Sequence, residues 1–337
     1  MTLNTSTGTI GDNAPAAGAF PANHEYYVRE FTEIANPELV YDLFGTPKDI
    51  PNNSSNTIKF NKVLKLDTDA SYQLTEGVTP TEQTFQLARI EKAINQYGGY
   101  ARTTDRLTEE SINGLTSEFN TRIAEQGAEV MNKVVRDDLN GGTNVRYQGG
   151  AANRDAITAS AMPFGDFDFM FQAFKLEKVK PIRPMTMGSQ NINTTPTRET
   201  YPVIVPVEST DLLESLDDSK GNTFINTEKY GSQRPVWMNE YGTFKQFSFI
   251  LNTEVDVVEN AAGTPQDIAL ASVFGKGAYH YTHIGRSSVD VIIKPLGSSG
   301  SLDPLNQRSS IGWKAKKGAV IVQPTYMFRY EFSLGDA

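Results

Sequence analysis

Cysteine is absent from the chain, and histidine is scarce, with three residues in 337. The absence of cysteine excludes disulfide frameworks, thiolate zinc sites, iron–sulfur clusters and cysteine nucleophiles, and it leaves the redox compartment open. Three histidines provide little acid–base capacity near neutral pH. No apolar run approaches the roughly 18 residues of a membrane-spanning helix. Residues 1–19 also lack the basic and apolar blocks of a secretory signal, so we expect a soluble protein without a membrane span.

Positive charge is also in short supply, because 31 Lys and Arg stand against 40 Asp and Glu and give a net charge of −9. General binding to nucleic acid through the release of phosphate counterions is therefore excluded, and so is a DNA-wrapping role. The hydrophobic fraction of 38% is slightly low for a globular chain. At roughly 150 residues per domain the length fits about two domains. We expect a sizeable but somewhat lean core.

The first 56 residues predict an acidic N-terminal arm, with seven acidic side chains and two basic ones. Residues 24–44 are amphipathic and include Tyr26 and Phe31 among their apolar side chains. A stretch rich in Pro and Asn then breaks regular structure before residue 57. We predict that this arm of residues 1–56 needs a neighbouring molecule to order it.

Residues 57–99 predict an extended β-hairpin. Apolar and polar residues alternate from Thr57 to Leu66, and a second extended run covers Thr84 to Ile94. The 17 residues between the two runs are polar and include Gly77 and Pro80. Because so long a connection cannot bury much of itself, we predict that the hairpin tip is mobile or lies against another molecule.

A long helix is predicted from Thr104 to Asn140, where six apolar residues recur at helical spacing: Ile112, Leu115, Phe119, Ile123, Val130 and Val134. We expect Thr108 to cap its start and the Gly141-Gly142 pair to end it. About 33 residues at ~1.5 Å each would reach ~50 Å, which exceeds one compact domain of this size. Gly127 lies on the apolar stripe, where we expect a close backbone neighbour.

The remaining chain predicts a mixed α+β region over residues 151–285 and returning strands over residues 286–337. We expect a strand at Tyr201–Val207 and a pair of strands at Phe244–Leu251 and Glu254–Val258. The last strand carries four aromatic residues on one face, namely Tyr326, Phe328, Tyr330 and Phe332. We predict that this face packs on the long helix, which would join residues 100–150 and 286–337 into one discontinuous domain around an inserted domain.

The sequence contains no Walker loop, dinucleotide fingerprint or nucleophile elbow. His280 and His283 have no acidic third ligand nearby, so we favour packing over metal binding. The basic cluster beside Trp313, formed by Lys314, Lys316 and Lys317, fits a nucleic-acid patch less well than a solvated surface or a contact to an acidic neighbour. We therefore expect no catalytic residue, no cofactor and no metal.

Five short motifs occur in a fixed order along the chain. They are Leu74–Pro80, then Gln96–Tyr100 leading to Thr104-Asp105, then Glu240–Phe244, Phe274–Tyr279, and Asp303–Gln307 followed by Ile311–Lys314. Together with the order of arm, hairpin, long helix, inserted region and return strand, these motifs resemble the phage major capsid proteins of the Hong Kong-97 fold. The similarity is greatest to the branch of the coliphage N-four capsid protein, and it covers about residues 25–333.

The resemblance implies an α+β fold with an N-terminal arm, an extended hairpin loop, a long spine helix, a discontinuous peripheral domain and an inserted axial domain. It implies a non-enzymatic shell protein of the virion, assembled in the host cytoplasm as hexamers and pentamers around double-stranded DNA that it does not read. Further candidate partners are a separate scaffolding protein, a portal and decoration proteins. The residues expected to contact neighbouring copies are Leu74, Glu76, Gly77, Val78, Pro80, Tyr26, Phe31, Trp313 and Lys314.

Two other classes of protein stay open. A β-rich virion surface, adhesion or binding module would explain the content of Thr, Asn and Tyr, although it needs neither a long helix nor an acidic arm. An enzyme that cleaves carbohydrates or phosphate esters would need convergent polar groups, which the sequence does not offer. Formation of particles by the expressed protein distinguishes a shell protein from both.

Overall fold

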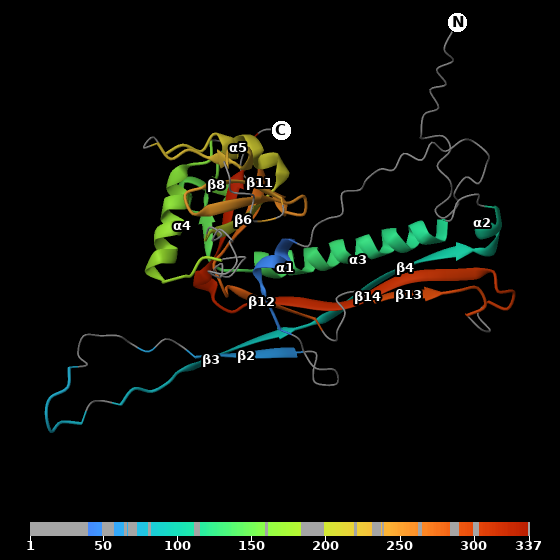
Figure 1. Ribbon diagram of the computed structural model, residues 1–337, viewed down its shortest axis with the longest axis horizontal. Coiled ribbons are helices and arrows are strands. Elements are labelled where there is room, and N and C mark those ends of the chain that lie inside the picture. The colour runs from blue at the N-terminus through green and yellow to red at the C-terminus, as the bar shows by residue number, and fades with distance from the viewer. Residues whose placement is uncertain are drawn as a thin grey trace, which may run out of the picture.

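A compact unit and a long, thin body meet at one end in the computed structural model of the chain, and a two-stranded hairpin projects from the place where they meet (Figure 1). The structure describes residues 40–48, 57–63, 66, 73–79, 82–110, 115–158, 161–182, 199–218, 221–230, 237, 239–261, 265–283, 290–298 and 303–335. Tyr26, Phe31 and Pro80 lie outside these residues, as does most of the predicted arm.

The helices are α1 Val40–Phe44, α2 Asp105–Glu110, α3 Leu115–Asn140, α4 Phe164–Leu176 and α5 Thr210–Glu214. The strands are β1 Thr46–Pro47, β2 Thr57–Val63, β3 Leu87–Ala93, β4 Asn95–Thr104, β5 Val145–Tyr147, β6 Tyr201–Val205, β7 Ile225–Asn226, β8 Glu240–Phe244, β9 Phe247–Leu251, β10 Val257–Glu259, β11 Asp267–Phe274, β12 Tyr279–His283, β13 Asp290–Lys294, β14 Arg308–Ile321 and β15 Met327–Ser333. The fold is therefore mixed α and β, as predicted.

The compact unit is built on an eight-stranded sheet in the order β5-β15-β11-β6-β9-β8-β7, with β10 paired to β11. Every residue of β6 is buried, as is typical of a strand covered on both faces. On one face, α4 inserts Phe167 and Phe174 into a core of aromatic rings. The ring centroid of Phe167 lies 5.5 Å from that of Tyr330. This core is closed by the compact unit itself.

The long body is built on β14, the central strand of a five-stranded sheet. One edge of β14 pairs with β4, and the other edge pairs first with β13 and then with β12. One face of β14 presents Ile311, Trp313 and Ala315 to α3, where they contact Ile123 and Met131. α3 lies along this face for most of its length (Figure 1). The opposite face of the sheet carries no described helix.

The predicted hairpin is confirmed as an antiparallel pair of β2 and β3, with Thr57 opposite Ala93 and Val63 opposite Leu87. β4 follows after one residue but pairs with β14, so the hairpin ends earlier than the predicted boundary at residue 99. Residues 95–104 therefore belong to the sheet of the long body.

The predicted cap of the long helix is wrong. α2 begins at Asp105, where the hydroxyl oxygen of Thr104 accepts a hydrogen bond from the backbone N–H of Leu107 at 3.4 Å, and Thr108 lies inside the helix. α3 has 26 residues, which at ~1.5 Å each gives ~39 Å rather than ~50 Å. Gly127 is buried on the apolar side of α3, as its place on the stripe suggested.

The predicted strand pair at Phe244–Leu251 and Glu254–Val258 is also wrong. The first segment contains strand β9, but β9 pairs with the preceding β8 across a turn at Lys245, whose φ is +54°. Such turns usually take Asn or Gly, so Lys gives no turn signal in the sequence. The Lys245 ammonium lies 3.6 Å from the carboxylate of Asp218 and also contacts that of Asp168, which holds the turn in place. β10 pairs with β11 instead.

The aromatic face of the last strand does not pack on the long helix. β15 pairs with β11 in the sheet of the compact unit, and its aromatic face packs against α4. Conversely, β12, which falls in the predicted inserted region, pairs with β14 in the long body. The aromatic pattern identified a buried strand face correctly, but it carried no information about which partner would cover that face.

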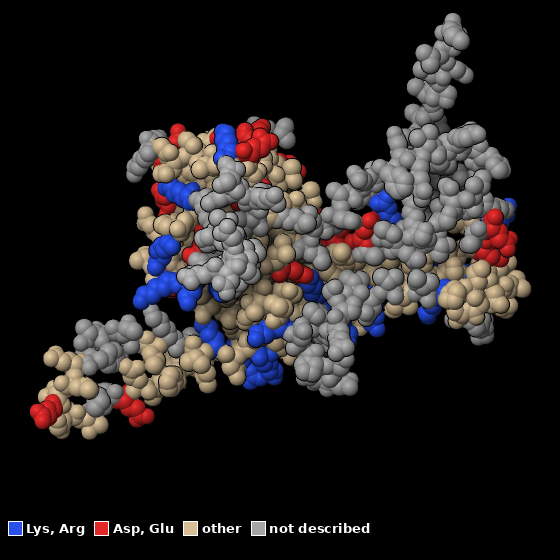
Figure 2. Space-filling model, viewed as in Figure 1, with Lys and Arg blue, Asp and Glu red and all other residues tan. Residues whose placement is uncertain are grey.

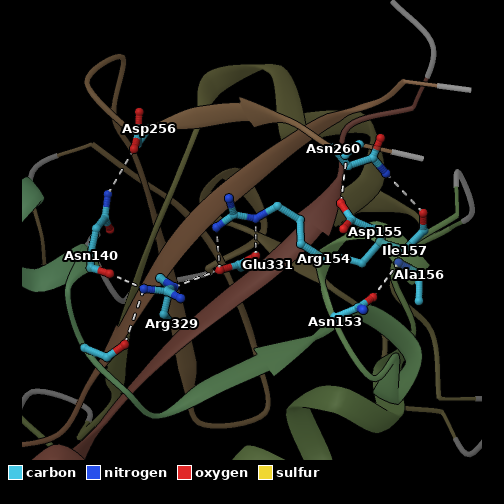
Figure 3. Close-up of polar contacts among 12 residues, drawn as sticks. Asn140, Asn153, Arg154, Asp155, Ala156, Ile157, Asp256, Asn260, Arg329 and Glu331 are labelled. Carbon is cyan, nitrogen blue, oxygen red and sulfur yellow. Dashed lines mark hydrogen bonds and ion pairs between the residues drawn. The ribbon is translucent and has the colours of Figure 1, made fainter. Parts of the chain in front are cut away.

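The compact unit is joined to the end of α3 by a buried carboxylate and two arginines (Figure 3). Glu331 on β15 is fully buried and accepts hydrogen bonds from Arg154 at 2.7 Å and from Arg329 at 2.8 Å. The guanidinium of Arg329 also donates to the carbonyl oxygens of Asn140 and Gly142, where the negative end of the helix dipole favours a cation. Hydrogen bonding to Glu331 raises the pKa of Arg154.

Candidate assembly surfaces

Side chains on both strands attach the hairpin to the rest of the molecule. The ammonium of Lys62 donates to the side-chain oxygen of Gln323 at 2.5 Å, and the ammonium of Lys92 lies 2.5 Å from the carboxylate of Asp138. The ring of Phe60 lies 5.2 Å from that of His280 on β12. The strands therefore leave the long body in a fixed direction.

The tip of the hairpin, residues 73–79 with the flanking residues 82–87, is exposed. Leu74 and Val78 are 73% and 63% exposed, and Phe85 and Leu87 are exposed to a similar degree. Thr75 to Val78 form a tight turn in which the N–H of Val78 donates to the carbonyl oxygen of Thr75 at 3.1 Å and Gly77 has a φ of +81°. A positive φ at this position requires Gly. The tip thus presents apolar side chains on a preformed turn with no partner of its own among the described residues.

A second surface, which no other described element covers, lies on the face of the long body that α3 leaves open. It contains a hollow of about 650 Å³ that crosses β4, β14 and β13. Two glycines form part of its floor. A Cβ atom on Gly98 would lie 2.9 Å from the carbonyl oxygen of Trp313, and one on Gly312 would lie 3.0 Å from that of Gly99. Gly is therefore required here for the close approach of β4 and β14, and it leaves the sheet surface hollow.

The lining of this hollow is basic and partly apolar. The strand register places Tyr100 of β4 on one side of Gly312 and Ile292 of β13 on the other. The side chains of Tyr100 and Ile292 are 68% and 43% exposed. Four cationic residues line it: Arg102, Lys294, Arg308 and Lys314. Among the described lining residues the one acid is Asp303, which is buried and accepts a hydrogen bond from the backbone N–H of Arg308 at 2.7 Å. We call this surface the basic hollow.

The residues predicted to contact neighbours fall in different places. Leu74, Glu76, Gly77 and Val78 lie together in the exposed tip. Lys314 lies in the basic hollow on β14, a strand that runs away from the hairpin (Figure 1).

Trp313, which was predicted to contact a neighbouring copy, is instead buried within the subunit. Its side chain is 5% exposed and lies under α3, where its indole N–H donates to the side-chain oxygen of Gln126 at 3.3 Å. It is a core residue of the long body, because residues alternate between the two faces of a strand and its neighbour Lys314 takes the open face.

Sequence reasoning missed Tyr100, Arg102, Ile292 and Lys294 as parts of one surface. The signal that could have pointed to them is the pair of Gly-rich segments, at residues 98–99 and 312, each next to an aromatic residue. Gly inside a strand often marks a close backbone approach. The register of β4 and β13 against β14, which brings these four residues to one surface, could not be derived from the sequence.

The described residues contain no group of three or more His, Asp or Glu that could hold a metal ion. His280 lies on β12, where burial, together with the positive charge of Lys48, lowers its pKa and keeps the ring neutral. No described helix is long and apolar enough to cross a membrane.

Comparison with solved structures gives many similar chains, although no family model and no characterised sequence matches this one. The capsid protein in "Capsid of Ralstonia phage GP4" superposes with a TM-score of 0.63 and 12% identity, over 86% of this chain and 87% of that one. The chain in "Capsid structure of the Cyanophage P-SCSP1u" gives 0.59 and 10% identity, over 91% of each chain. The chain has the fold of phage capsid proteins. A Helicobacter pylori phage, KHP40, provides a third head protein of this fold, with a TM-score of 0.56 and 14% identity over 86% of this chain and 87% of that one.

Proposed function

We propose that this chain is a major capsid protein of the Hong Kong-97 fold, a non-enzymatic shell protein that assembles into the icosahedral head around double-stranded phage DNA. The observation that carries the proposal is the likeness to phage capsid structures over almost the whole chain at TM-scores of up to 0.63. The two unpartnered surfaces support it, since a chain that functions alone rarely leaves large apolar side chains exposed on a projecting hairpin.

The proposed domains are those of the Hong Kong-97 fold, with domain boundaries that differ from the ones predicted from the sequence. Residues 1–56 are the arm, the hairpin of β2 and β3 is the extended loop, and α3 is the spine helix. The peripheral domain is the long body around β14, and the axial domain is the compact unit. The division moves β15 to the axial domain and β12 to the peripheral one, because each pairs there.

We assign the hairpin tip of one copy to the basic hollow of the next. The stretch from residue 66 to residue 88 contains four acidic residues, Asp67, Asp69, Glu76 and Glu82, and no Lys or Arg. In Figure 2 the described side chains toward the tip include acidic ones and none that are basic. The tip and the basic hollow are therefore opposite in charge, and both present apolar side chains. Electrostatic complementarity of this kind fixes partner and register.

Geometry requires this contact to join two copies. The hairpin points away from the long body on one side, whereas β4 and β13 end on the other (Figure 1). A contact between two different surfaces of the same chain is heterologous, and it generates a ring when the rotation between copies closes. Hexamers and pentamers are rings of this type. A separate scaffolding protein, a portal and decoration proteins are proposed as further partners.

Electron microscopy of the expressed chain tests the function. We expect capsomers, shells or tubular assemblies, alone or with co-expressed scaffolding protein. An adhesion or binding module would instead remain a 37.1 kDa monomer at high concentration whatever protein accompanies it.

Cysteine crosslinking tests the assigned contact, because the chain has no Cys of its own. One preparation carries Glu76→Cys and the other Lys314→Cys, and the two are mixed and assembled. We expect a disulfide-linked dimer on non-reducing gels. The matched control pairs Glu76→Cys with Lys180→Cys, an exposed site on the compact unit, and should give no dimer. Particles without the dimer would remove the assigned contact and leave the capsid function standing.

A further inference from the structure

Residues 40–48, which we call the strap, lie at the joint between the compact unit and the long body (Figure 1). The strap consists of α1, β1 and the residues that join and follow them. Three of its apolar side chains, Val40, Tyr41 and Phe44, are 1%, 0% and 5% exposed, whereas Leu43 is 52% exposed. A segment of nine residues has no core of its own, so this burial comes entirely from what surrounds it.

Both parts of the molecule supply the surroundings of the strap. The same cluster of buried residues contains Ile204, Ile250, Phe274 and Met327 from the sheet of the compact unit, and Val135, Leu139, Tyr279 and Ala319 from the long body. The ring of Phe44 lies 4.8 Å from that of Trp237, edge to face, and 6.1 Å from that of Phe274. The strap therefore fills space between the two parts, beside the direct contact of Arg329 with the end of α3.

Polar contacts fix the strap in one position. The ammonium of Lys317 on β14 is 1% exposed and lies 2.5 Å from the carboxylate of Asp42. The hydroxyl of Tyr279 donates to the carbonyl oxygen of Tyr41. A buried ammonium that lacks its carboxylate is strongly destabilising, so the surroundings of Lys317 favour an acidic residue at position 42 of the strap.

Gly45 allows the strap to lie flat against β12. A Cβ atom there would lie 2.6 Å from ring atoms of both Tyr279 and Tyr281, so a larger residue would have to displace these rings. β1 then runs parallel to β12, and the backbone N–H of Lys48 donates to the carbonyl oxygen of Tyr281 at 2.9 Å. Side-chain and backbone contacts thus both hold the strap.

We infer that the strap locks the angle between the compact unit and the long body. When the strap is seated, the two parts share one core. When the strap is withdrawn, Lys317 loses its ion pair with Asp42 and a cavity remains in the buried cluster. Both effects lower the stability of the arrangement in which the two parts share one core.

Single-molecule FRET on dilute, unassembled subunits tests this lock. Dyes are placed on Lys180→Cys in the compact unit and Lys294→Cys in the long body, both exposed positions in a chain without other cysteines. We expect one narrow distance population for the full chain and for a deletion of residues 1–39. A deletion of residues 1–48 should add a second, broad population.

Two point variants separate unlocking from misfolding. Gly45→Val puts a side chain between the two tyrosine rings, and Asp42→Asn removes the charge facing Lys317 with little change in volume. Each should add the broad population and should speed proteolytic cleavage within residues 40–48 by roughly tenfold. Gly165→Ala is the matched control, since a Cβ atom there meets nothing within 4 Å.

Circular dichroism checks that the variants remain folded. A narrow, unchanged population in folded Asp42→Asn and in the 1–48 deletion would overturn the inference. This measurement does not depend on assembly, so its failure is distinct from a failure of the proposed capsid function.

Discussion

The compact unit and the hairpin use apolar residues in opposite ways. In the compact unit, Phe167, Phe174 and Tyr330 are fully buried among residues of the same chain. In the hairpin, Leu74, Val78 and Phe85 are 63–73% exposed, although the turn at Thr75–Val78 is well defined. The first region is complete within one copy, and the second is shaped for a surface that one copy does not provide to itself. Stability of the subunit and ability to assemble should therefore respond to different substitutions.

The largest effect on the subunit should come from the aromatic core of the compact unit. Phe167→Ala removes a ring that contacts four other aromatic rings and should lower the free energy of unfolding by about 3–5 kcal/mol. Chemical denaturation of the unassembled subunit measures this. Leu176→Ala on the same helix, at an 83% exposed position, is the control and should change stability by less than about 0.5 kcal/mol. Equal losses for both variants would contradict the assigned core.

A somewhat smaller loss should follow from Glu331→Gln, which removes the carboxylate shared by Arg154 and Arg329. Breaking a fully buried ion pair costs about 3–5 kcal/mol. Because the Arg154 side chain is 31% exposed and stays partly hydrated, we expect about 2–3 kcal/mol. Arg89→Gln, in an exposed pair with Glu91 on the hairpin, is the control and should cost well under 1 kcal/mol. Thermal unfolding of both variants makes the comparison.

The hairpin should show the reverse behaviour. The double variant Leu74→Ser and Val78→Ser should leave the unfolding free energy of the subunit within about 0.5 kcal/mol. Particle yield should fall sharply, because the apolar contact of the tip with a neighbour is lost. Sedimentation of assembled material against unassembled subunit measures the yield. Normal yield from this variant would place the main contacts between copies elsewhere.

The smallest effect concerns the surface of the compact unit. The hydroxyl of Tyr241 donates to the carboxylate of Glu214 at 2.5 Å, and this hydrogen bond raises the pKa of Tyr241 from 10.0 to about 12. Because the pKa of Tyr241 is higher in the folded state than in the unfolded state, its hydrogen bond contributes fully to stability below pH 10. This contribution is lost as the pH rises through about 12. Titration followed by tyrosinate absorbance should show this late step. Glu214→Gln should move it back toward 10, and an unchanged step would exclude Glu214 as its cause.

Local pattern was a good guide to elements and a poor guide to their partners. Alternation predicted the hairpin of β2 and β3, and helical spacing predicted α3, because both signals depend on neighbours a few residues apart. The four aromatic residues around β15 indicated a buried face, yet its cover is α4 rather than α3. A buried face has the same composition whichever apolar surface covers it. The hairpin of β8 and β9 was missed because its turn uses Lys245, held by contacts that are distant in sequence.

The candidate surfaces divide in the same way. The tip was predictable because a long polar connection with Gly77 cannot bury itself. The basic hollow was not, because Arg102, Lys294 and Lys314 come from three strands whose register only the sheet defines. Trp313 was assigned to the surface by its basic neighbours, whereas strand alternation places it in the core.

The sequence by itself determined the absence of cysteine, the acidic balance, and the existence of a hairpin, a long helix and a final aromatic strand. These follow from composition and from spacings within one element. Only the tertiary structure decided that β15 closes the compact unit, that residues 40–48 are held between two parts of the molecule, and that four cations gather on an open sheet face. The physical reason is that burial and charge pairing depend on which surfaces meet, and residues as distant as Asp42 and Lys317 meet only in the folded chain.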